Sequence, residues 1–192
     1  MRKVYAFDFD GTLTTSDTLL AFIRYAKGTP AFIWGFLHHA HLMILMKLKL
    51  YPNWKAKQKV FSHFFKGMDL ETFDSLCQQF ASENRQLLRP NGIKLIEQVK
   101  ADDADVIIVS ASIDNWVQPF FPHVKVLGTQ IEVKDGNLTG HFLTKNCYGQ
   151  EKVNRILTFY PDRSTYYLIA YGDSRGDKEL LNFADEAHFR AL

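Results

Sequence analysis

Pairs of acidic side chains directly follow two apolar segments of this 192-residue sequence. Asp8 and Asp10 come after a short run of β-branched and aromatic residues, and Asp173 and Asp177 come after another. In an extended segment, side chains two positions apart point to the same side, so Asp8 and Asp10 share one space. Two carboxylates so close repel each other, and a bound cation or a shared proton relieves the repulsion. The spacing therefore predicts a cation site or an acid–base pair.

Two further polar positions suit the same chemistry. Ser110 follows the apolar run Asp105–Val109, and Lys152 begins a predicted helix; Ser112 and Lys145 are the competing serine and lysine. Carboxylates without cysteine or histidine favour Mg²⁺ over zinc. A hydroxyl and an ammonium group donate to phosphate oxygens, one carboxylate can act as a nucleophile, and another can transfer protons. The set predicts phosphoryl transfer, which needs mainly positioning and charge neutralisation.

The elements that must position these residues follow from the apolar periodicity. Continuous apolar runs predict three buried strands, at Lys3–Phe9, Asp105–Val109 and Tyr166–Tyr171. Helical patterns at Gly92–Lys100 and Glu151–Phe159 lie between them, and Gln130–Phe142 has the pattern of a β-hairpin. Strands that alternate with helices predict an α/β fold with a Rossmann-like open parallel sheet. The carboxyl ends of such strands meet at one edge, where ligands bind.

Residues 16–89 differ from the rest of the chain. Their pattern predicts helices at 16–27, 30–50, 53–66 and 69–88 and no comparable strand. We therefore expect an α/β core domain, formed by residues 1–15 and 90–192, with a helical cap domain inserted after its first strand. The predicted cap holds 10 Lys and Arg against 5 Asp and Glu, a net charge of +5, and the rest holds 13 against 16, a net charge of −3.

The composition excludes several classes of protein. Apolar residues make up 46% of the chain, which excludes a disordered protein, and the net charge of +2 argues against a nucleic-acid partner. Cys77 and Cys147 are far apart and have no metal-binding spacing. The first residues lack the pattern of a signal peptide, so we expect a cytoplasmic protein with two free thiols.

The apolar stretch Ala31–Met46 raises the question of a membrane. Its sixteen residues are interrupted by histidines, and a spanning helix needs about 20 apolar residues, so we expect no transmembrane span. A buried or edge helix is the preferred interpretation. The alternative is a helix at the membrane interface, with peripheral membrane contact, which Lys47 and Lys49 at its end favour. We interpret His38 and His41 as a polar stripe rather than a metal site.

The motifs resemble those of the haloacid dehalogenase-like hydrolases. The segment D-F-D-G-T-L at residues 8–13 matches the family's first motif, D-x-D-x-[TV]. The serine, lysine and G-D-x-x-x-D motifs follow in the family's order over nearly the whole chain. The helical insert resembles a C1-type cap. The stretches V-S-A-S, L-T-G, N-C-x-G-x-x-K and Y-G-D-S resemble the subgroup of the phosphoserine phosphatases.

The resemblance implies a Mg²⁺-dependent phosphatase that acts on a small-molecule phosphoester through an aspartyl-phosphate. It implies that Asp8 is the nucleophile and Asp10 the general acid and base. Asp8, Asp173 and the backbone carbonyl of Asp10 would hold the metal, and Asp177 would support them. The phosphoryl group would be held by Ser110 and Lys152. The implied substrate-binding positions are Gly11, Thr12, Asp17 and Ala111, with Thr12 also orienting the acidic loop.

Three alternatives remain open. One is a phosphoserine phosphatase, from which this chain departs at three places. Those enzymes carry a glutamate after the first motif, where this chain has Asp17. They also carry two glycines after the serine, where it has Ala111 and Ser112, and an asparagine where it has Gly176. The apolar cap helix with basic flanks also resembles the subgroup's phosphatidylglycerophosphate phosphatases, which act on a lipid at a membrane. A phospho-accepting or Mg²⁺-binding domain without turnover is the non-enzymatic alternative.

Overall fold

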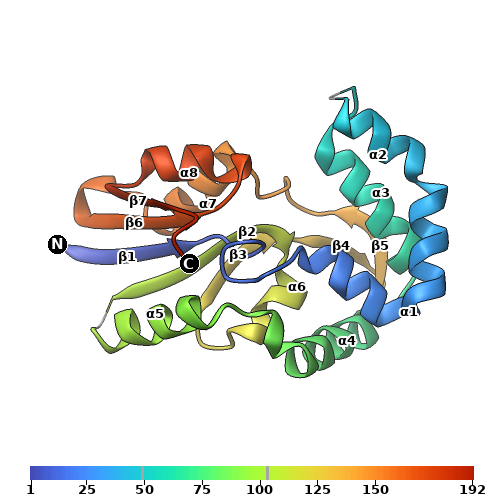
Figure 1. Ribbon diagram of the computed structural model, residues 1–192, viewed down its shortest axis with the longest axis horizontal. Coiled ribbons are helices and arrows are strands. Elements are labelled where there is room, and N and C mark those ends of the chain that lie inside the picture. The colour runs from blue at the N-terminus through green and yellow to red at the C-terminus, as the bar shows by residue number, and fades with distance from the viewer. Residues whose placement is uncertain (49, 103) are drawn as a thin grey trace.

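The computed structural model describes residues 1–48, 50–102 and 104–192, and for Met43 and Lys47 it describes the backbone alone. Five parallel strands form the central sheet, in the spatial order β3-β2-β1-β6-β7 (Figure 1). They are β1 (Arg2–Phe7), β2 (Asp105–Ile113), β3 (Lys125–Thr129), β6 (Tyr166–Gly172) and β7 (Glu186–Phe189). Val4 in the central β1 lies opposite Asp105 of β2 and Leu168 of β6. The predicted Rossmann-like α/β sheet is confirmed.

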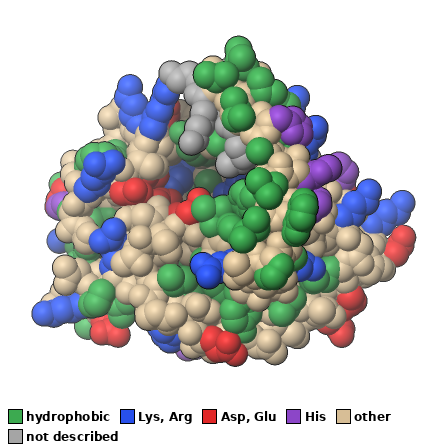
Figure 2. Space-filling model, turned by 45° about the vertical axis from the view of Figure 1, so that its right-hand side comes forward, with side chains coloured by type: hydrophobic (Ala, Val, Ile, Leu, Met, Phe, Trp, Pro, Cys, Tyr) green, Lys and Arg blue, Asp and Glu red, His purple; other side chains and the backbone are tan. Residues whose placement is uncertain are grey.

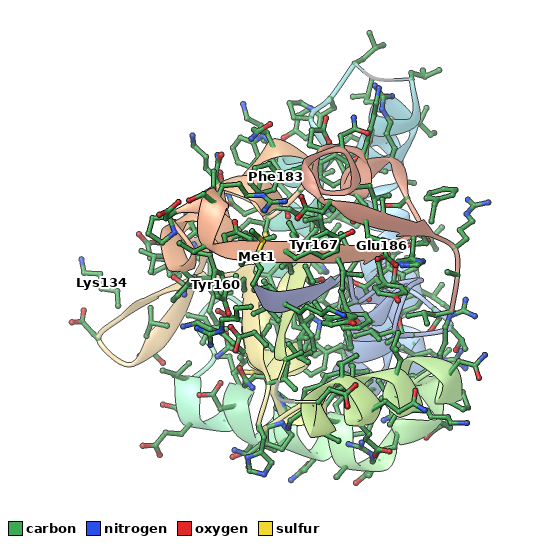
Figure 3. The ribbon with its side chains drawn as sticks, turned by 90° about the vertical axis from the view of Figure 1, so that its left-hand side faces the viewer. Met1, Lys134, Tyr160, Tyr167, Phe183 and Glu186 are labelled. Carbon is green, nitrogen blue, oxygen red and sulfur yellow. The ribbon has the colours of Figure 1, made fainter. Side chains whose placement is uncertain are left out.

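Helices cover both faces of this sheet, which explains why its strands read as continuous apolar runs. On one face lie α7 (Gln150–Phe159) and α8 (Lys178–Phe183), and on the other α5 (Pro90–Ala101) and α6 (Asp114–Val117). Val4 packs in a cluster with Ile156 of α7, whereas Phe7 packs in a second cluster with Ile96 of α5. Figure 3 shows the sheet from the side of Met1, with Phe183 of α8 above it and α5 below.

The predicted second strand is too short. It continues beyond Val109 through Ser110 to Ile113, and its pairing with β3 shifts register between Val109 and Ile113. The serines interrupt the apolar run but do not end the strand. Both Ser110 and Ser112 are completely buried within it. The polar positions therefore lie within the last part of β2.

Four helices follow β1 and precede α5: α1 (Thr18–His38), α2 (Ala40–Lys47), α3 (Asn53–Phe65) and α4 (Leu70–Glu83). The first bends at Gly28, whose φ of 77° is not helical, and then continues through Pro30. The helix predicted over residues 30–50 is wrong as a single element, because His39, with φ −100° and ψ 8°, separates α1 from α2. Side chains of α1, α3 and α4 share a continuous apolar cluster with the sheet, including Phe22, Phe61 and Phe7.

The predicted hairpin is present as β4 (Ile131–Lys134) and β5 (Asn137–Phe142). Its turn residues Asp135 and Gly136 have φ of 51° and 77°, as a tight hairpin turn requires. The hairpin packs on the cap side: the amide of Gly67 donates to the Leu138 carbonyl at 2.7 Å, and the rings of Phe61 and Phe142 are 5.9 Å apart. A hairpin from the predicted core segment thus supports the helices, and the domain limits 16–89 stay a prediction.

The remaining elements are short. Single 3₁₀ turns occur at Arg85–Leu87, Gln118–Phe120, Arg163–Thr165 and Arg175–Asp177. Within the described ranges, no helix has both the length and the apolar character needed to cross a bilayer. Lys49, one of the two lysines predicted beside the apolar stretch, lies outside the described residues.

Candidate active site

The carboxyl ends of β1, β2 and β6 bring the predicted motifs to one edge of the sheet. Asp8 follows β1, and its amide donates to the Tyr171 carbonyl of β6 at 2.9 Å, which fixes the start of the acidic loop. Asp173 follows β6, and Ser110 lies in β2. Residues far apart in the sequence are therefore neighbours, as expected for the edge of a parallel sheet.

A buried lysine lies at the centre of the site. The side chain of Lys152, which is 2% exposed, places its Nζ 2.5 Å from Asp8 Oδ1 and 2.6 Å from Asp177 Oδ1. It reaches them from the first turn of α7, which starts at Gln150. The competing Lys145 is exposed, and its carbonyl accepts a hydrogen bond from Arg155. The geometry thus favours Lys152 over Lys145 as the lysine of the site.

Burial and the neighbouring charges shift the pKa of each of these three groups in opposite directions. Burial raises the pKa of Asp8 to about 7, although the ammonium of Lys152 pulls it down. Burial would also raise the pKa of Asp177, but Lys152 and hydrogen bonds from Ser174 outweigh it and lower that pKa. For Lys152 itself, burial would lower the pKa, but the two carboxylates outweigh it and raise that pKa. Lys152 therefore stays charged while Asp8 is poised to change protonation.

Three carboxylates form a group with the spacing of a cation site. One oxygen each of Asp8, Asp173 and Asp177 lies within 4.8 Å of the other two. Thr12 Oγ1 connects two of them, with distances of 3.2 Å to Asp173 Oδ1 and 3.4 Å to Asp8 Oδ2. Three carboxylates and one ammonium leave an excess of negative charge, which a divalent cation with oxygen ligands would balance. The donor set therefore fits Mg²⁺.

Two backbone features hold this acidic group in place. Asp177, completely buried, accepts hydrogen bonds at Oδ2 from the amides of Asp173 at 3.2 Å and Ser174 at 3.0 Å. Gly11 has φ of +83°, and a Cβ at this position would lie 2.4 Å from Asp173 Oδ2. Asp177 thus shapes the loop that carries Asp173, and Gly11 provides the space for the Asp173 carboxylate.

The carboxylate of Asp10 lies apart from that group. Its Oδ1 accepts hydrogen bonds from the amide and hydroxyl of Thr18 at 2.7 and 2.6 Å, and its Oδ2 accepts one from the hydroxyl of Ser112. The Asp10 side chain is therefore fixed between the start of α1 and the end of β2. The Asp10 carboxylate is thus held by other partners than Lys152, which contacts Asp8 and Asp177, and it is suited to proton transfer. Ser112, the weaker serine candidate from the sequence, thus contacts the site through Asp10.

The segment Ser110–Ser112 connects the site to the cap helices. The hydroxyl of Ser110 accepts a hydrogen bond from the amide of Ser112 at 3.0 Å. The carbonyl of Ala111 accepts hydrogen bonds from Thr129 Oγ1 at 3.0 Å and from Nζ of Lys57 at 2.8 Å. Lys57 belongs to α3, so a cation from the cap helices reaches the site.

Sequence reasoning missed Lys57. Burial lowers its pKa, and the nearby Asp10 and Asp17 oppose that effect. A weak signal exists, because Lys57 stands next to Ala56 and four residues before Phe61, at the margin of the buried face of α3. That position alone does not distinguish it from a surface lysine.

Asp17, predicted to bind substrate, makes its hydrogen bonds within its own segment of the chain. Its Oδ1 accepts hydrogen bonds from the amides of Leu19 at 2.9 Å and Leu20 at 3.4 Å, so it caps the N-terminus of α1. Figure 2 shows a hollow between the cap helices and the core, with acidic side chains on one rim and hydrophobic side chains on the other.

A Rossmann-like sheet with carboxylates and a buried lysine at its carboxyl edge, below inserted helices, defines a class of α/β hydrolases. The family model of the haloacid dehalogenase-like hydrolases matches residues 5–182. The chain belongs to this family and is a hydrolase.

The chain is also similar to individual proteins. The chain is 34% identical over 191 residues to protein CicA of Caulobacter vibrioides, and the match covers 96% of this chain and 84% of CicA. A Bordetella pertussis protein of unknown function has a similar structure, with a TM-score of 0.82, 17% identity and coverage of 95% of this chain and 86% of that chain. A substrate-bound phosphoserine phosphatase has a TM-score of 0.62, 19% identity and coverage of 96% and 83%. Both structures resemble this chain in fold.

Proposed function

We propose that the protein is a Mg²⁺-dependent phosphomonoester hydrolase that forms an aspartyl-phosphate on Asp8. The observation that carries the proposal is the position of Asp8, which lies 2.5 Å from the buried ammonium of Lys152 and within 4.8 Å of Asp173 and Asp177. A carboxylate so placed is a nucleophile beside groups that neutralise a phosphoryl group.

Each residue then has a defined part in the reaction. A carboxylate oxygen of Asp8 attacks phosphorus, and the bond from phosphorus to the substrate's alcohol oxygen breaks. Asp10 donates a proton to that oxygen and, in the second step, takes a proton from the water that attacks the aspartyl-phosphate. Inorganic phosphate leaves and Asp8 is restored. Thr18 and Ser112 orient Asp10 for both transfers through their hydrogen bonds to its carboxylate.

The phosphoryl group requires further neutralisation. In this proposal Ser110 and Lys152 hold its oxygens, and Lys57 of α3 adds a further cation. The metal would be held by Asp8, Asp173 and the backbone carbonyl of Asp10, with Asp177 as support, and it would supply positive charge to the reacting phosphate. This arrangement favours a small anionic phosphoester. Asp17 is engaged in capping α1, so we do not assign it the amine recognition that phosphoserine requires.

The test of this proposal is hydrolysis of p-nitrophenyl phosphate by the purified protein, with Mg²⁺ and with EDTA. We expect activity with Mg²⁺ alone, none in Asp8→Asn, and a large loss of kcat with nearly unchanged Mg²⁺ affinity in Asp10→Ala. Asp135→Asn at the exposed hairpin turn makes the same change as Asp8→Asn and serves as the control. Activity that persists in EDTA or in Asp8→Asn contradicts the mechanism. Mg²⁺ binding without turnover of any phosphoester favours the non-enzymatic alternative.

A second candidate is a lipid phosphatase at the membrane surface, of the phosphatidylglycerophosphate type. Large apolar side chains of α1, α2 and the following loop are exposed, and Figure 2 shows hydrophobic side chains gathered on this part of the molecule. The most exposed are Ile33, Trp34, Leu37, Ile44, Leu48 and Leu50. Together with the positive charge of residues 16–89, they suit an anionic bilayer. Co-sedimentation with anionic vesicles at low salt tests this candidate, and lack of binding contradicts it.

A further inference from the structure

A groove beside the site is not used by the mechanism above. It has a volume of about 890 Å³ and lies between the N-terminal part of α3 and the segment that joins β5 to α7. Its lining includes Trp54 from α3, Phe142 at the end of β5, and Leu143 and Tyr148 from that segment. Trp54, Leu143 and Tyr148 are 44%, 63% and 42% exposed, so their apolar surface is available to a ligand.

The α3 wall of the groove leads toward one cation of the site, Lys57, which donates to the Ala111 carbonyl. Trp54 precedes Lys57 by three residues on α3, so the two side chains share a helix face. On the opposite wall, Glu151 lies in the first turn of α7, while the neighbouring Lys152 is buried and points to Asp8 and Asp177. Lys57 and Lys152 are the two cations assigned to the phosphoryl group. A ligand whose phosphate contacts Lys57 can place its remaining part along the α3 wall of the groove.

The floor of the groove is also connected to the site. Tyr148 packs against the loop after β6, where a Cβ on Gly176 would lie 2.5 Å from its ring. Asn146, another lining residue, accepts a hydrogen bond from Thr129, which also donates to the Ala111 carbonyl. Thr129 is completely buried, so these hydrogen bonds link the groove lining to the catalytic edge of the sheet through the interior.

The chemistry of the walls selects the kind of group that fits. Aromatic and aliphatic side chains stand on both sides, so an apolar group between them loses contact with water on both faces. The charged side chains of the lining are Lys145 and Glu151, and Glu151 is paired with Arg155 at 2.9 Å. Gln58 is engaged as well, because it accepts a hydrogen bond from the amide of Phe142 at 3.0 Å. The groove thus suits an apolar group better than an amino acid.

We infer that the groove binds the alcohol part of the phosphoester, and that this alcohol carries an aromatic or long-chain apolar group packed against Trp54. This inference rests on the proposed phosphatase function and adds its substrate class. Trp54 and Leu143 determine specificity, because they contact the leaving group and not the phosphate. An aromatic alcohol and an alkyl chain share this chemistry, and the experiment separates them.

Hydrolysis of matched alkyl phosphates tests the inference. Propyl, octyl and benzyl phosphates all release primary alcohols, so differences in kcat/KM report mainly on contacts of the apolar part. We expect kcat/KM for octyl or benzyl phosphate to exceed that for propyl phosphate at least tenfold, since each buried methylene contributes about 0.8 kcal/mol, roughly a fourfold change in affinity. The ester with the higher kcat/KM, octyl or benzyl phosphate, shows whether the groove prefers an alkyl chain or an aromatic group. Equal values for all three esters overturn the inference.

Variants of the lining residues test whether the preference for the longer ester comes from the groove. Trp54→Ala and Leu143→Ala, both at exposed positions that tolerate truncation, should lower the octyl-to-propyl ratio about tenfold and fivefold, chiefly through KM. Trp34→Ala is the matched control, because Trp34 is 74% exposed and lies outside the groove lining. A loss that is equal for propyl and octyl phosphate in Trp54→Ala, or a loss of the ratio in Trp34→Ala, contradicts the assignment.

A binding measurement separates this inference from the proposed reaction. The Kd values of octylphosphonate and propylphosphonate, measured by calorimetry in the Asp8→Asn variant, do not depend on turnover. Tighter binding of octylphosphonate that Trp54→Ala removes supports the groove even when no ester is hydrolysed. Equal binding of both phosphonates overturns the groove assignment even when the phosphatase activity is present.

Discussion

Replacing Lys152 by methionine tests whether one buried cation holds the acidic site together. Lys152 is 2% exposed, and its ammonium lies 2.5 Å from Asp8 and 2.6 Å from Asp177. Methionine keeps most of the side-chain length and removes the charge. Because two buried carboxylates lose their partner, we expect the free energy of unfolding to fall by about 3–5 kcal/mol. For a chain of this size, this lowers Tm by roughly 6–20 °C.

The size of this loss should depend on pH. Burial raises the pKa of Asp8 to about 7, so Asp8 is largely protonated in the folded protein at about pH 5.5 and ionised at about pH 8.5. Protonated Asp8 does not need the cation, whereas the ionised form does. The difference in stability between the wild type and Lys152→Met should therefore be larger at the higher pH.

Urea denaturation in EDTA at these two pH values measures the effect without bound metal. Lys145→Met makes the same substitution at an exposed lysine and should change the free energy of unfolding by less than about 0.5 kcal/mol. A Lys152→Met variant that loses no more stability than Lys145→Met, or that loses the same amount at both pH values, refutes the argument from buried charge.

Three further predictions concern the same edge of the sheet. The raised pKa of Asp8 means that the folded state holds its proton more tightly, so metal-free wild type should lose stability as the pH rises from about 4 to about 7, by up to roughly 1.4 kcal/mol per pH unit. Asp8→Asn should flatten this profile in urea titrations, and an unchanged slope contradicts the assignment. Gly11→Ala should weaken Mg²⁺ binding at least tenfold by calorimetry, because its Cβ would meet a carboxylate of the metal group. Gly136→Ala, with a similar positive φ but open space, should leave binding unchanged. Ser112→Ala removes a hydrogen bond to Asp10 and should lower kcat about tenfold and shift the pH–rate profile, with KM nearly constant.

The sequence supports the sheet and most of the site because both depend on local patterns. A continuous apolar run predicts a buried strand, and the residue after it lies at the ligand-binding edge if the sheet is parallel. Asp8 and Asp173 could be placed by this rule without knowledge of any contact. Lys152 required the order of the motifs as well, because a single lysine at the start of a helix usually lies on the surface.

The parts that the sequence did not predict depend on packing between distant segments. Lys57 reaches the Ala111 carbonyl of β2 from α3, a helix that packs on α1, α2 and β5, so the contact depends on tertiary structure. The break at His39 has no glycine or proline beside it, and it separates two helices that pack on α3 at different angles (Figure 1). The groove at Trp54 is formed by two segments about ninety positions apart, so no local pattern contains it.

The structure also changes the meaning of the charge distribution. From the counts alone, the net charge of +5 in residues 16–89 suggests a general attraction of the cap for an anionic substrate. Lys55 and Lys59 are exposed and lie over the rings of Trp54 and Tyr51 at 5.5 and 5.7 Å, and such surface charges are screened beyond about 8 Å at physiological salt. Lys57 lies between them in the sequence but points inward, where its charge interacts with the carboxylates of the site. Of these three lysines, Lys57 is the one that contributes directly to the electrostatics of the site, and its position depends on the contact between α3 and Ala111 of β2.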